Sequence, residues 1–468
     1  MKAPHQPPAS EPGCSPLATQ LLERAGRSHH QVIDLGLERL KSLLARLGHP
    51  ERAMPPAIHV AGTNGKGSTT AFMRAMVEGS GLRCHVMTSP HLLRLTERFV
   101  VGNHEVGEKE LDATLTEIME ASKGSPVTPF ELLTAAGFML FARHPADLCL
   151  VEVGLGGRLD ATNLLRDVRA SVITPISLDH QDFLGNSVAQ IAAEKAGIIR
   201  KGVPVVSAAQ SPAAAQAIAQ AARQAGTSLW REGVDFKAIL QAGHMLYQDR
   251  LALPAVIPTA GQAEWFKLSL PQPALQGTHQ VQNATVAVAA LRAAGVRVTP
   301  QGWRGLGKAQ WPARGQILKG SLAHILPEGW RLMVDGAHNE GGAQALAALL
   351  RQEGQPGMAV HLVCGLKNTK DASGYFKPLL PLANTLQAVA EPGQHQAQAP
   401  EAIVDAAQKA WASMAGTAAP PTISQAPTIR QALKNIRAQA QSGQPGLVVL
   451  CGSLYLAAIA LRLDAQPA

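Results

Sequence analysis

The residues best suited to chemistry lie in a glycine-rich segment that follows a short apolar run. The run covers 58–61, and the segment is Gly62-Thr63-Asn64-Gly65-Lys66-Gly67-Ser68, followed by a helical stretch. Glycines let backbone N–H groups approach phosphate oxygens, and a helix N-terminus and a lysine add positive charge. The segment therefore predicts an ATP-binding phosphate loop, in which Lys66 acts on the phosphates and Ser68 or Thr69 contacts magnesium.

The spacing of this loop departs from the common G-x-x-x-x-G-K-S/T pattern, because Gly67 separates Lys66 from Ser68. The alternative is a glycine-rich turn between a strand and a helix, with an incidental lysine. Three glycines and one lysine between a strand and a helix favour the phosphate loop.

Two more ionisable residues are candidates for the site, one at the end of a predicted strand and one in a predicted helix. Glu152 follows the apolar run 148–151 and precedes a glycine-rich turn, so we expect its carboxylate at the carboxyl edge of a parallel sheet. Magnesium accepts one carboxylate together with a hydroxyl, phosphate and water. Lys195 lies among small and apolar residues, where an unpaired ammonium is costly. A salt bridge to Glu194 or Asp179 is one explanation for it.

Six segments occur in an order that resembles a known family. They are 62–68, 88–92, 152–158, 178–180, 194–198 and 335–339. Together they resemble folylpolyglutamate synthase and dihydrofolate synthase, within the Mur ligase superfamily. The resemblance implies a bifunctional ATP-dependent ligase that adds L-glutamate to dihydropteroate and to tetrahydrofolate through an acyl phosphate. A monofunctional folylpolyglutamate synthase is the alternative, and a nucleotide-binding protein without ligase chemistry is disfavoured.

The resemblance also implies a metal site. It makes Ser89 and Glu152 ligands of one magnesium ion and assigns His180 to a second. It further implies that carbon dioxide carbamylates Lys195, which then binds the second ion as a carboxylate. Taken alone, His180 is a poor magnesium ligand, because imidazole suits softer metals. The alternative is a loop histidine that bonds to a neighbouring aspartate.

Three segments are implied to bind the pterin end of the substrate. Their residues are Ile33, Asp34, Leu35, Thr128, Pro129, Phe130, Glu131, Leu159, Asp160 and Ala161. Asp34 can accept hydrogen bonds from paired N–H donors, and Phe130 offers an apolar face to a ring. Without the resemblance, a helix N-cap and a core aromatic are the favoured interpretations of these two residues.

Nucleotide-binding residues are implied in both halves of the chain. The resemblance assigns Asn283 and Arg314 to ATP, Asp335 to its ribose or phosphates, and His338 to a catalytic place near the nucleotide or the incoming amine. Arg314 follows Ala313, where the family often has glycine. Contributions from two domains imply a cleft that closes around ATP.

The elements that must position these residues alternate between short apolar runs and longer stretches of helical period. The predicted strands are 58–61, 85–87, 148–153, 171–174 and 203–206, then 331–334, 360–364, 386–389 and 447–450; the predicted helices are 68–79, 109–122, 131–143, 188–199 and 283–294. This pattern is typical of parallel α/β sheets. We therefore expect an N-terminal P-loop domain with a mainly parallel sheet and a smaller C-terminal Rossmann-like α/β domain.

Stretches that contain several proline and glycine residues suggest the domain limits. We expect a disordered tail over 1–18, an ATPase domain of the Mur ligase central type over 19–310, and a C-terminal α/β domain over 311–468, joined through 302–314. The tail is rich in proline and serine and lacks the apolar centre of a signal peptide. Residues 209–276 have too weak a period for assignment, and an antiparallel excursion is one option.

Composition narrows the partners. The 468 residues are 46% hydrophobic, with 42 basic against 34 acidic side chains and a net charge of +8, which suits a globular protein with a small anionic substrate. Few aromatics and the absence of basic runs disfavour nucleic acid, and no apolar run is long enough for a membrane span. Five widely spaced cysteines indicate reduced thiols, so we expect a cytoplasmic protein. No heptad or extended apolar stripe calls for an oligomer, so we expect a monomer.

Overall fold

The computed structural model describes residues 13–27, 35–250, 265–355, 357–368, 372–414, 419–441 and 443–466. The chain divides into two compact units. The first unit comprises Met1–Ala274 and Gln280–Gln310, and the second comprises Leu275–His279 and Trp311–Ala468.

The first unit is built on a sheet that has eight strands among the described residues, in the order β4-β3-β2-β5-β1-β6-β7-β8. The strands are β1 (Ala57–Ala61), β2 (Cys84–Met87), β3 (Phe99–Val101), β4 (His104–Glu105), β5 (Leu148–Glu152), β6 (Val168–Ile173), β7 (Val205–Ser207) and β8 (Leu229–Arg231). All neighbours from β2 to β8 are parallel, and β3 and β4 form an antiparallel edge. The predicted mainly parallel sheet is confirmed, with fully buried β1 at its centre.

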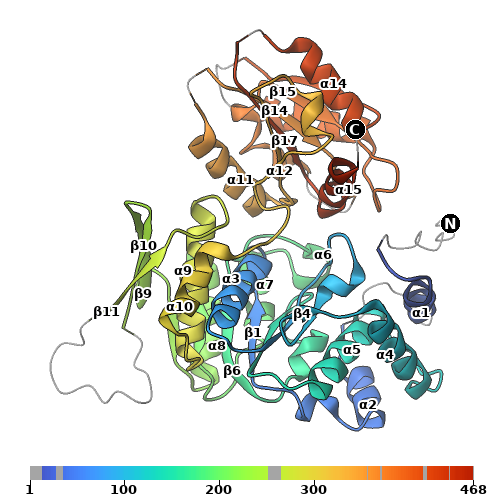
Figure 1. Cartoon of the computed structure of the whole chain (residues 1–468), viewed down its shortest axis with the longest axis vertical. Coiled ribbons are helices and arrows are strands. Elements are labelled where there is room, and N and C mark those ends of the chain that lie inside the picture. The colour runs from blue at the N-terminus through green and yellow to red at the C-terminus, as the bar shows by residue number, and fades with distance from the viewer. Residues whose placement is uncertain are drawn as a thin grey trace. The chain divides into compact units, whose positions relative to one another are not determined.

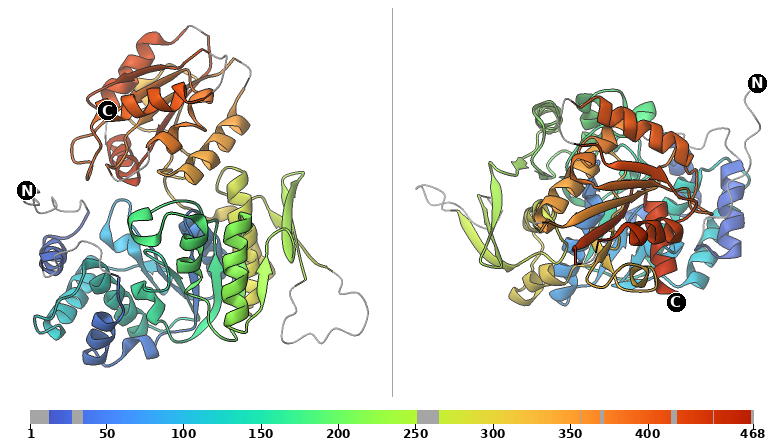
Figure 2. Two further views of the ribbon diagram at one scale, coloured as in Figure 1. Left: turned by 180° about the vertical axis from the view of Figure 1, so that it is seen from behind. Right: turned by 90° about the horizontal axis from the view of Figure 1, so that it is seen from above.

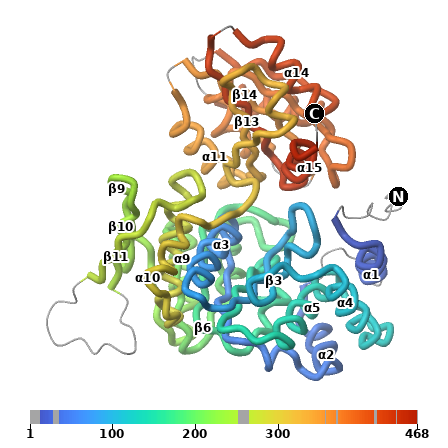
Figure 3. Tube along the Cα trace, viewed as in Figure 1, coloured from blue at the N-terminus to red at the C-terminus, as the bar shows by residue number. Residues whose placement is uncertain are grey.

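Helices surround this sheet (Figure 1). They are α1 (Pro16–Arg27), α2 (Glu38–Arg46), α3 (Lys66–Gly79), α4 (Glu108–Ala121), α5 (Pro129–Arg143), α6 (Gln181–Leu184), α7 (Val188–Ala196), α8 (Pro212–Gln224), α9 (Thr278–Ala293) and α10 (Pro300–Trp303), with 3₁₀ turns η1 (Pro50–Arg52), η2 (Leu95–Arg98), η3 (Ala161–Leu164) and η4 (Arg304–Lys308). Helices α1, α2, α4 and α5 pack together, as Figure 3 shows. Their buried leucines, phenylalanines and methionines form one apolar core with the sheet.

Two sequence predictions need correction in this unit. Helix α1 begins at Pro16, inside the predicted disordered tail, because Ala18, Leu21 and Ala25 form a buried stripe at helical spacing. The predicted connection 302–314 is in part a packed element, since α10 and η4 lie on α3. Gly305 marks this contact, where a Cβ atom would be only 2.1 Å from the carbonyl oxygen of Ala75.

Residues 209–276, left unassigned from the sequence, contain a helix and a small sheet. After α8 and β8, strands β9 (Phe236–Gln241), β10 (His244–Asp249) and β11 (Phe266–Pro271) form an antiparallel sheet in the order β11-β10-β9. Figure 2, which views the molecule from behind and from above, shows this small sheet at the margin of the first unit.

The second unit contains a sheet of six strands among the described residues, in the order β12-β13-β17-β14-β15-β16. The strands are β12 (Gln316–Leu318), β13 (Arg331–Val334), β14 (Ala359–Cys364), β15 (Thr385–Ala388), β16 (Thr422–Gln425) and β17 (Gly446–Cys451); the helices are α11 (Glu340–Glu353), α12 (Ala372–Phe376), α13 (Pro400–Ala412), α14 (Ile429–Gln439) and α15 (Leu454–Ala465), with 3₁₀ turns η5 (Ala323–Ile325) and η6 (Leu380–Leu382). Only β12 runs antiparallel to its neighbour in this described sheet. The predicted second α/β domain is confirmed.

The structure also shows the state of the cysteines and the character of the helices. Cys84, Cys149, Cys364 and Cys451 are buried thiols in strands that form no disulfide among the described residues, and Cys14 is a half-buried thiol. Burial raises the pKa of Cys84 to about 12, which keeps this thiol protonated. Across the described ranges, no helix combines the length and the apolar character that crossing a membrane requires.

Candidate active site

The predicted phosphate loop connects β1 to α3. Helix α3 begins at Lys66, and Gly65 caps it with φ +85°. A Cβ atom on Gly65 would lie 2.3 Å from Asn283 Oδ1, and one on Gly62 would lie 1.9 Å from Thr174 Oγ1. These two positions therefore require glycine, because the loop backbone is pressed against Thr174, which follows β6, on one side and against α9 on the other. Asn283, predicted from the resemblance, lies directly beside the loop.

Lys66 and Glu152 face each other at the carboxyl edge of the sheet. Lys66 Nζ lies 3.7 Å from Glu152 Oε1 and donates a hydrogen bond to the carbonyl oxygen of Gly62 at 3.2 Å. Glu152 is the last residue of β5, and its Oε2 accepts the N–H of Ser89 at 3.3 Å. The structure thus brings together three of the residues predicted from the sequence.

The first turns of α3 carry hydroxyl groups that suit a bound ligand. The side-chain oxygens of Ser68, Thr69 and Thr70 are buried and have no hydrogen-bond partner within the described part of the chain. Buried polar atoms are normally paired, and those at a helix N-terminus suit an anion or its metal ion. Among the described residues, no group of three His, Cys, Asp or Glu side chains could hold a metal alone. One carboxylate with hydroxyls nonetheless fits magnesium, which takes phosphate and water as its other ligands.

Lys195 is a buried amine near the end of α7. Its side chain is 6% exposed, and burial lowers its pKa to about 7, with a smaller contribution from the charge of Lys66. Asp179 and Asp160 act in the opposite direction. About half of the amine is therefore neutral near pH 7.

The salt bridge considered for Lys195 is absent from the described residues, where no carboxylate lies within 4.0 Å of its Nζ. Glu194 pairs with Arg158 instead, at 2.9 Å. Gly157 lies against this end of α7, because a Cβ atom there would be 2.8 Å from the carbonyl oxygen of Lys195. The glycine-rich turn after Glu152 thus packs directly on the backbone of the buried lysine.

His180 lies in the loop that leads into α6. Its backbone adopts φ +52°, and its side chain is 44% exposed. Nε2 lies 3.9 Å from Asp179 Oδ1, and the backbone N–H donates to the same oxygen at 2.9 Å. The structure therefore shows the neighbouring aspartate that the sequence alternative named.

The segment that precedes α5 is fixed by a capping box. The hydroxyl oxygen of Thr128 accepts the N–H of Glu131 at 3.2 Å, and Glu131 Oε2 accepts the N–H of Thr128 at 2.8 Å. Arg39, which the sequence analysis did not single out, donates from Nε to Glu131 Oε1 at 3.1 Å. With Pro129 in the first turn, these contacts engage the Glu131 carboxylate internally.

Phe130 is the residue of this segment that reaches the glycine-rich turn. A Cβ atom on Gly154 would lie 2.2 Å from Phe130 Cζ, so the ring rests on the glycine. Phe130 is half-buried, as are Leu159 and Leu35. The predicted substrate residues Ile33 and Asp34 lie outside the described residues.

Asp160 and Ala161 are buried beyond the same turn. Asp160 Oδ2 accepts the N–H of Leu155 at 2.8 Å, and Oδ1 accepts both the N–H of Thr162 at 3.0 Å and its hydroxyl. Burial raises the pKa of Asp160, and these donors act against that effect. Both carboxylate oxygens are therefore engaged within the protein.

The second unit holds its own cluster at the end of β13. Asp335 is 6% exposed; Oδ2 accepts the N–H of Gly315 and Oδ1 that of Ala337, each at 2.8 Å. Arg314 lies beside Gly336, where a Cβ atom would be 2.9 Å from its Nη1. Asp335 thus closes the turn that carries Arg314.

Two more residues complete this cluster. His338 Nδ1 lies 2.9 Å from the carbonyl oxygen of Gly336. Ala313 has φ +58°, so the departure from glycine noted in the sequence places an alanine in the left-handed region. Burial lowers the pKa of His279, while the charges of Asp335 and Arg314 act on it in opposite directions.

Comparisons with known proteins first define the class of enzyme. Residues 60–291 match the Mur ligase middle domain, and residues 321–463 match the C-terminal domain of dihydrofolate synthetase. The chain has a phosphate loop on a mainly parallel sheet and a second α/β unit. Together with these matches, this architecture defines it as a Mur-type, ATP-dependent ligase.

Similar proteins then identify the family. The chain is 36% identical to the dihydrofolate synthase/folylpolyglutamate synthase of Bacillus subtilis, over 68% of this chain and 72% of that protein. Escherichia coli FolC in complex with DHPP and ADP superposes with a TM-score of 0.81 at 30% identity, covering 97% and 98% of the two chains. The bifunctional enzyme of Yersinia pestis, complexed with AMPPNP and a Mn ion, gives 0.79 at 29% identity, covering 97% and 99%. The chain belongs to the dihydrofolate synthase/folylpolyglutamate synthase family.

Proposed function

We propose that this chain adds L-glutamate to dihydropteroate and to tetrahydrofolate, with ATP as the source of an acyl phosphate. The observation that carries the proposal is the opposition of Lys66 and Glu152, 3.7 Å apart, beside a glycine-rich loop with buried hydroxyls at the start of α3. Relatives whose names contain both activities support the bifunctional form.

In the first step, a substrate carboxylate oxygen attacks the γ-phosphorus, and the bond to the ADP oxygen breaks. Lys66 offsets charge on the transferred group, while Glu152, Ser89 and the hydroxyl of Ser68 would hold magnesium, which stabilises the charge on the phosphate oxygens. The amine of glutamate then attacks the acyl carbon, loses a proton and displaces inorganic phosphate. His338 is our candidate for the side chain near that amine. Positioning supplies much of the rate, and no enzyme nucleophile is required.

We assign a second magnesium ion to His180 and a carbamylated Lys195. The buried amine has no carboxylate within 4.0 Å in the described residues, and its neutral form can attack carbon dioxide to give a carbamate and a proton. The product is a carboxylate-like anion that suits a hard cation. Incubation with ¹³C-bicarbonate should give a carbamate NMR signal that Lys195→Met abolishes. A signal unchanged in that variant, or no signal in the wild type, contradicts the assignment.

The remaining predicted contacts follow from the same proposal. Phe130 offers its ring to the pterin, together with residues of 33–35 and 159–161, and Asn283, Arg314 and Asp335 bind or support ATP. Residues from two units imply closure around the nucleotide. Scattering profiles that are identical with and without ATP and substrate would oppose closure.

The decisive experiment supplies the purified protein with ATP, magnesium and glutamate and measures phosphate release with 7,8-dihydropteroate or with tetrahydrofolate. Release with both substrates supports the bifunctional enzyme, and release with tetrahydrofolate alone supports the monofunctional alternative. Release without either substrate points to a plain ATPase.

Lys66→Ala should lose ATP affinity, and unchanged affinity would remove the phosphate-loop assignment. Light scattering of the same sample tests the proposed monomer.

A further inference from the structure

A buried series of hydrogen bonds connects the central strand to the glycine-rich turn after Glu152. His59 lies in β1 with no exposed surface, and its Nε2 is 2.8 Å from Thr162 Oγ1. The Thr162 hydroxyl donates to Asp160 Oδ1, and Asp160 Oδ2 accepts the N–H of Leu155. A single histidine within an apolar strand was the only signal for this series in the sequence.

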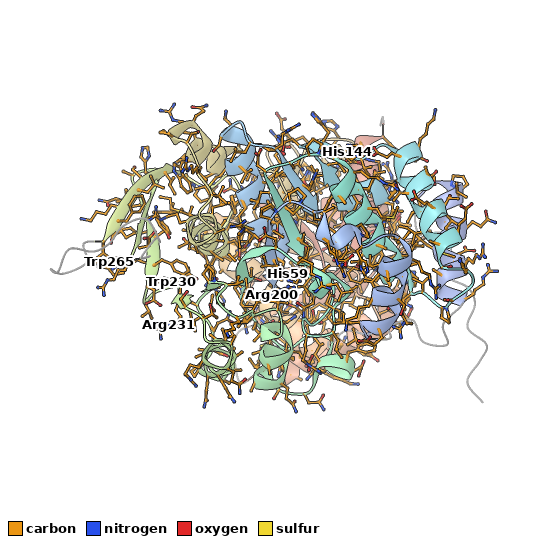
Figure 4. The ribbon with its side chains drawn as sticks, turned by 90° about the horizontal axis from the view of Figure 1, so that it is seen from below. His59, His144, Arg200, Trp230, Arg231 and Trp265 are labelled. Atoms are coloured by element: carbon orange, nitrogen blue, oxygen red, sulfur yellow. The ribbon has the colours of Figure 1, made fainter. Side chains whose placement is uncertain are left out.

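The direction of each hydrogen bond follows from the charge on Asp160. Both carboxyl oxygens face N–H donors, so the ionised form fits and a protonated oxygen would meet a donor. Thr162 must then give its proton to Asp160, and its oxygen accepts one from His59 Nε2. Burial, with a smaller effect from the charge of Arg200, lowers the pKa of His59 to about 3, which keeps the ring neutral. Figure 4 labels His59 and Arg200, which lie in the first unit.

The turn held by Asp160 touches two residues of the proposed site. Gly154 supports the ring of Phe130, because a Cβ atom there would lie 2.2 Å from Cζ. Gly157 rests on the backbone of Lys195, where the corresponding distance to the carbonyl oxygen is 2.8 Å. A displacement of this turn would therefore move the proposed pterin-binding ring and the end of the helix that carries the buried lysine.

We infer that His59 and Thr162 are positioning residues for the ligase reaction: they act through Asp160 to hold the turn that places Phe130 and Lys195. Both side chains are fully buried, so their effect on the reaction is indirect. Removal of a hydrogen-bond partner that orients a metal-binding residue typically lowers activity by about 10- to 100-fold. The inference rests on the proposed function.

Thr162→Val keeps the shape of the side chain and removes the hydroxyl. Its kcat should fall about 10- to 100-fold with both pterin substrates. The KM for ATP should stay near the wild-type value, because Thr63 anchors the phosphate loop to the carbonyl oxygens of Pro175 and Ser177. Thr162→Ser keeps the hydroxyl and should restore kcat. The matched control is Thr114→Val in α4, which removes a hydroxyl of similar burial that bonds to the carbonyl oxygen of Glu110 at 2.8 Å. Its kcat should not change.

The result that overturns the inference is a wild-type kcat for Thr162→Val, or an equal loss in the Val and Ser variants. Should Thr162→Val not fold, His59→Gln, whose amide can replace Nε2–H, compared with His59→Leu gives the same contrast. Nitrogen NMR of the histidine rings supplies a readout independent of activity: His59 should be the neutral Nε2–H tautomer, and an Nδ1–H tautomer contradicts the series. A wild-type protein without ligase activity would refute the proposed function, while the tautomer still decides the direction of the hydrogen bonds.

Discussion

Each unit ends a parallel strand with an acidic residue at its carboxyl edge, but the two carboxylates have different surroundings. Glu152 lies 3.7 Å from an ammonium and 3.3 Å from one backbone N–H. Asp335 accepts two backbone N–H groups at 2.8 Å each. One carboxylate faces a cation in a loop built for ligands, and the other closes a turn. At the same place in the fold, the carboxylate of the first unit faces Lys66, and that of the second unit holds the turn that carries Arg314.

The comparison extends to neighbouring polar groups. In the first unit, Ser68, Thr69 and Thr70 keep buried hydroxyls without partners in the described residues, and Lys195 is a buried amine. Such groups lower the stability of the protein and are concentrated at functional sites.

The largest expected effect is on catalysis in the first unit. Glu152→Gln should reduce the rate of phosphate release by about 10²- to 10³-fold, because the amide cannot replace the charge that magnesium and Lys66 meet. Steady-state assays with saturating ATP measure it. The comparison is supported if the variant keeps a thermal midpoint close to that of the wild type but loses this activity. A fully active variant contradicts it.

Lys195 should make the first unit more stable as the pH rises. Its folded-state pKa of about 7 lies below the unfolded value near 10.5, so the folded state binds fewer protons between these limits. The free energy of unfolding of the wild type should therefore increase from pH 7 toward pH 10 relative to Lys195→Met. Denaturant titrations in metal-free, carbon dioxide-free buffer measure this difference. A difference that is constant with pH would contradict the lowered pKa.

Asp335→Asn should destabilise the second unit. Asparagine has one acceptor oxygen, so its NH₂ group would face one of the two backbone N–H donors. The cost is about 1–3 kcal/mol of unfolding free energy. Calorimetry should show an earlier transition for this variant than for Glu152→Gln; the reverse order would break the contrast between the two carboxylates.

Two glycines offer a matched pair across the units. A Cβ atom would meet the ring of Phe130 at Gly154 and that of Trp330 at Gly446, at 2.2 and 2.3 Å. Both Gly→Ala variants should lose about 1–3 kcal/mol of stability through overpacking. Only Gly154→Ala should also raise the KM for dihydropteroate, since only its ring belongs to the proposed pterin pocket. Equal effects on KM would place the pocket elsewhere.

The smallest effect is expected at Ala313, which is buried with φ +58°. Ala313→Gly removes the strain of a left-handed alanine, against the larger chain entropy of glycine in the unfolded state. The net gain should be at most about 1 kcal/mol. A lower thermal midpoint of the second unit in this variant would mean that the lost methyl contacts outweigh the strain.

The sequence predicted the central strands well, because each is an apolar run between turn residues; the predicted 331–334 coincides with β13. It did not predict β9, where Ile239 and Leu240 are both exposed and the period of two is broken. It also missed the start of α1, because the first residues of this helix adjoin a segment rich in proline and serine, which predicted a disordered tail.

For the site, residue types and strand ends located Lys66, Glu152 and Asp335. The roles of the two carboxylates depend on which backbone N–H groups reach them, and turns such as the one at Gly315 decide that. His59 and Thr162 were missed for a related reason: they are 103 positions apart in the sequence, so no local pattern marks the bond between them.

The hydroxyls at the start of α3, which have no partner within the described residues, make the stability of the folded chain depend on the concentration of nucleotide. A ligand that engages them adds RT ln(1 + [L]/Kd) to stability, about 2.7 kcal/mol at a hundredfold excess over Kd. Degradation by proteases often follows the population of the opened state. When ATP falls in a cell, the amount of this enzyme should therefore fall with it, and limited proteolysis across an ATP series measures that coupling.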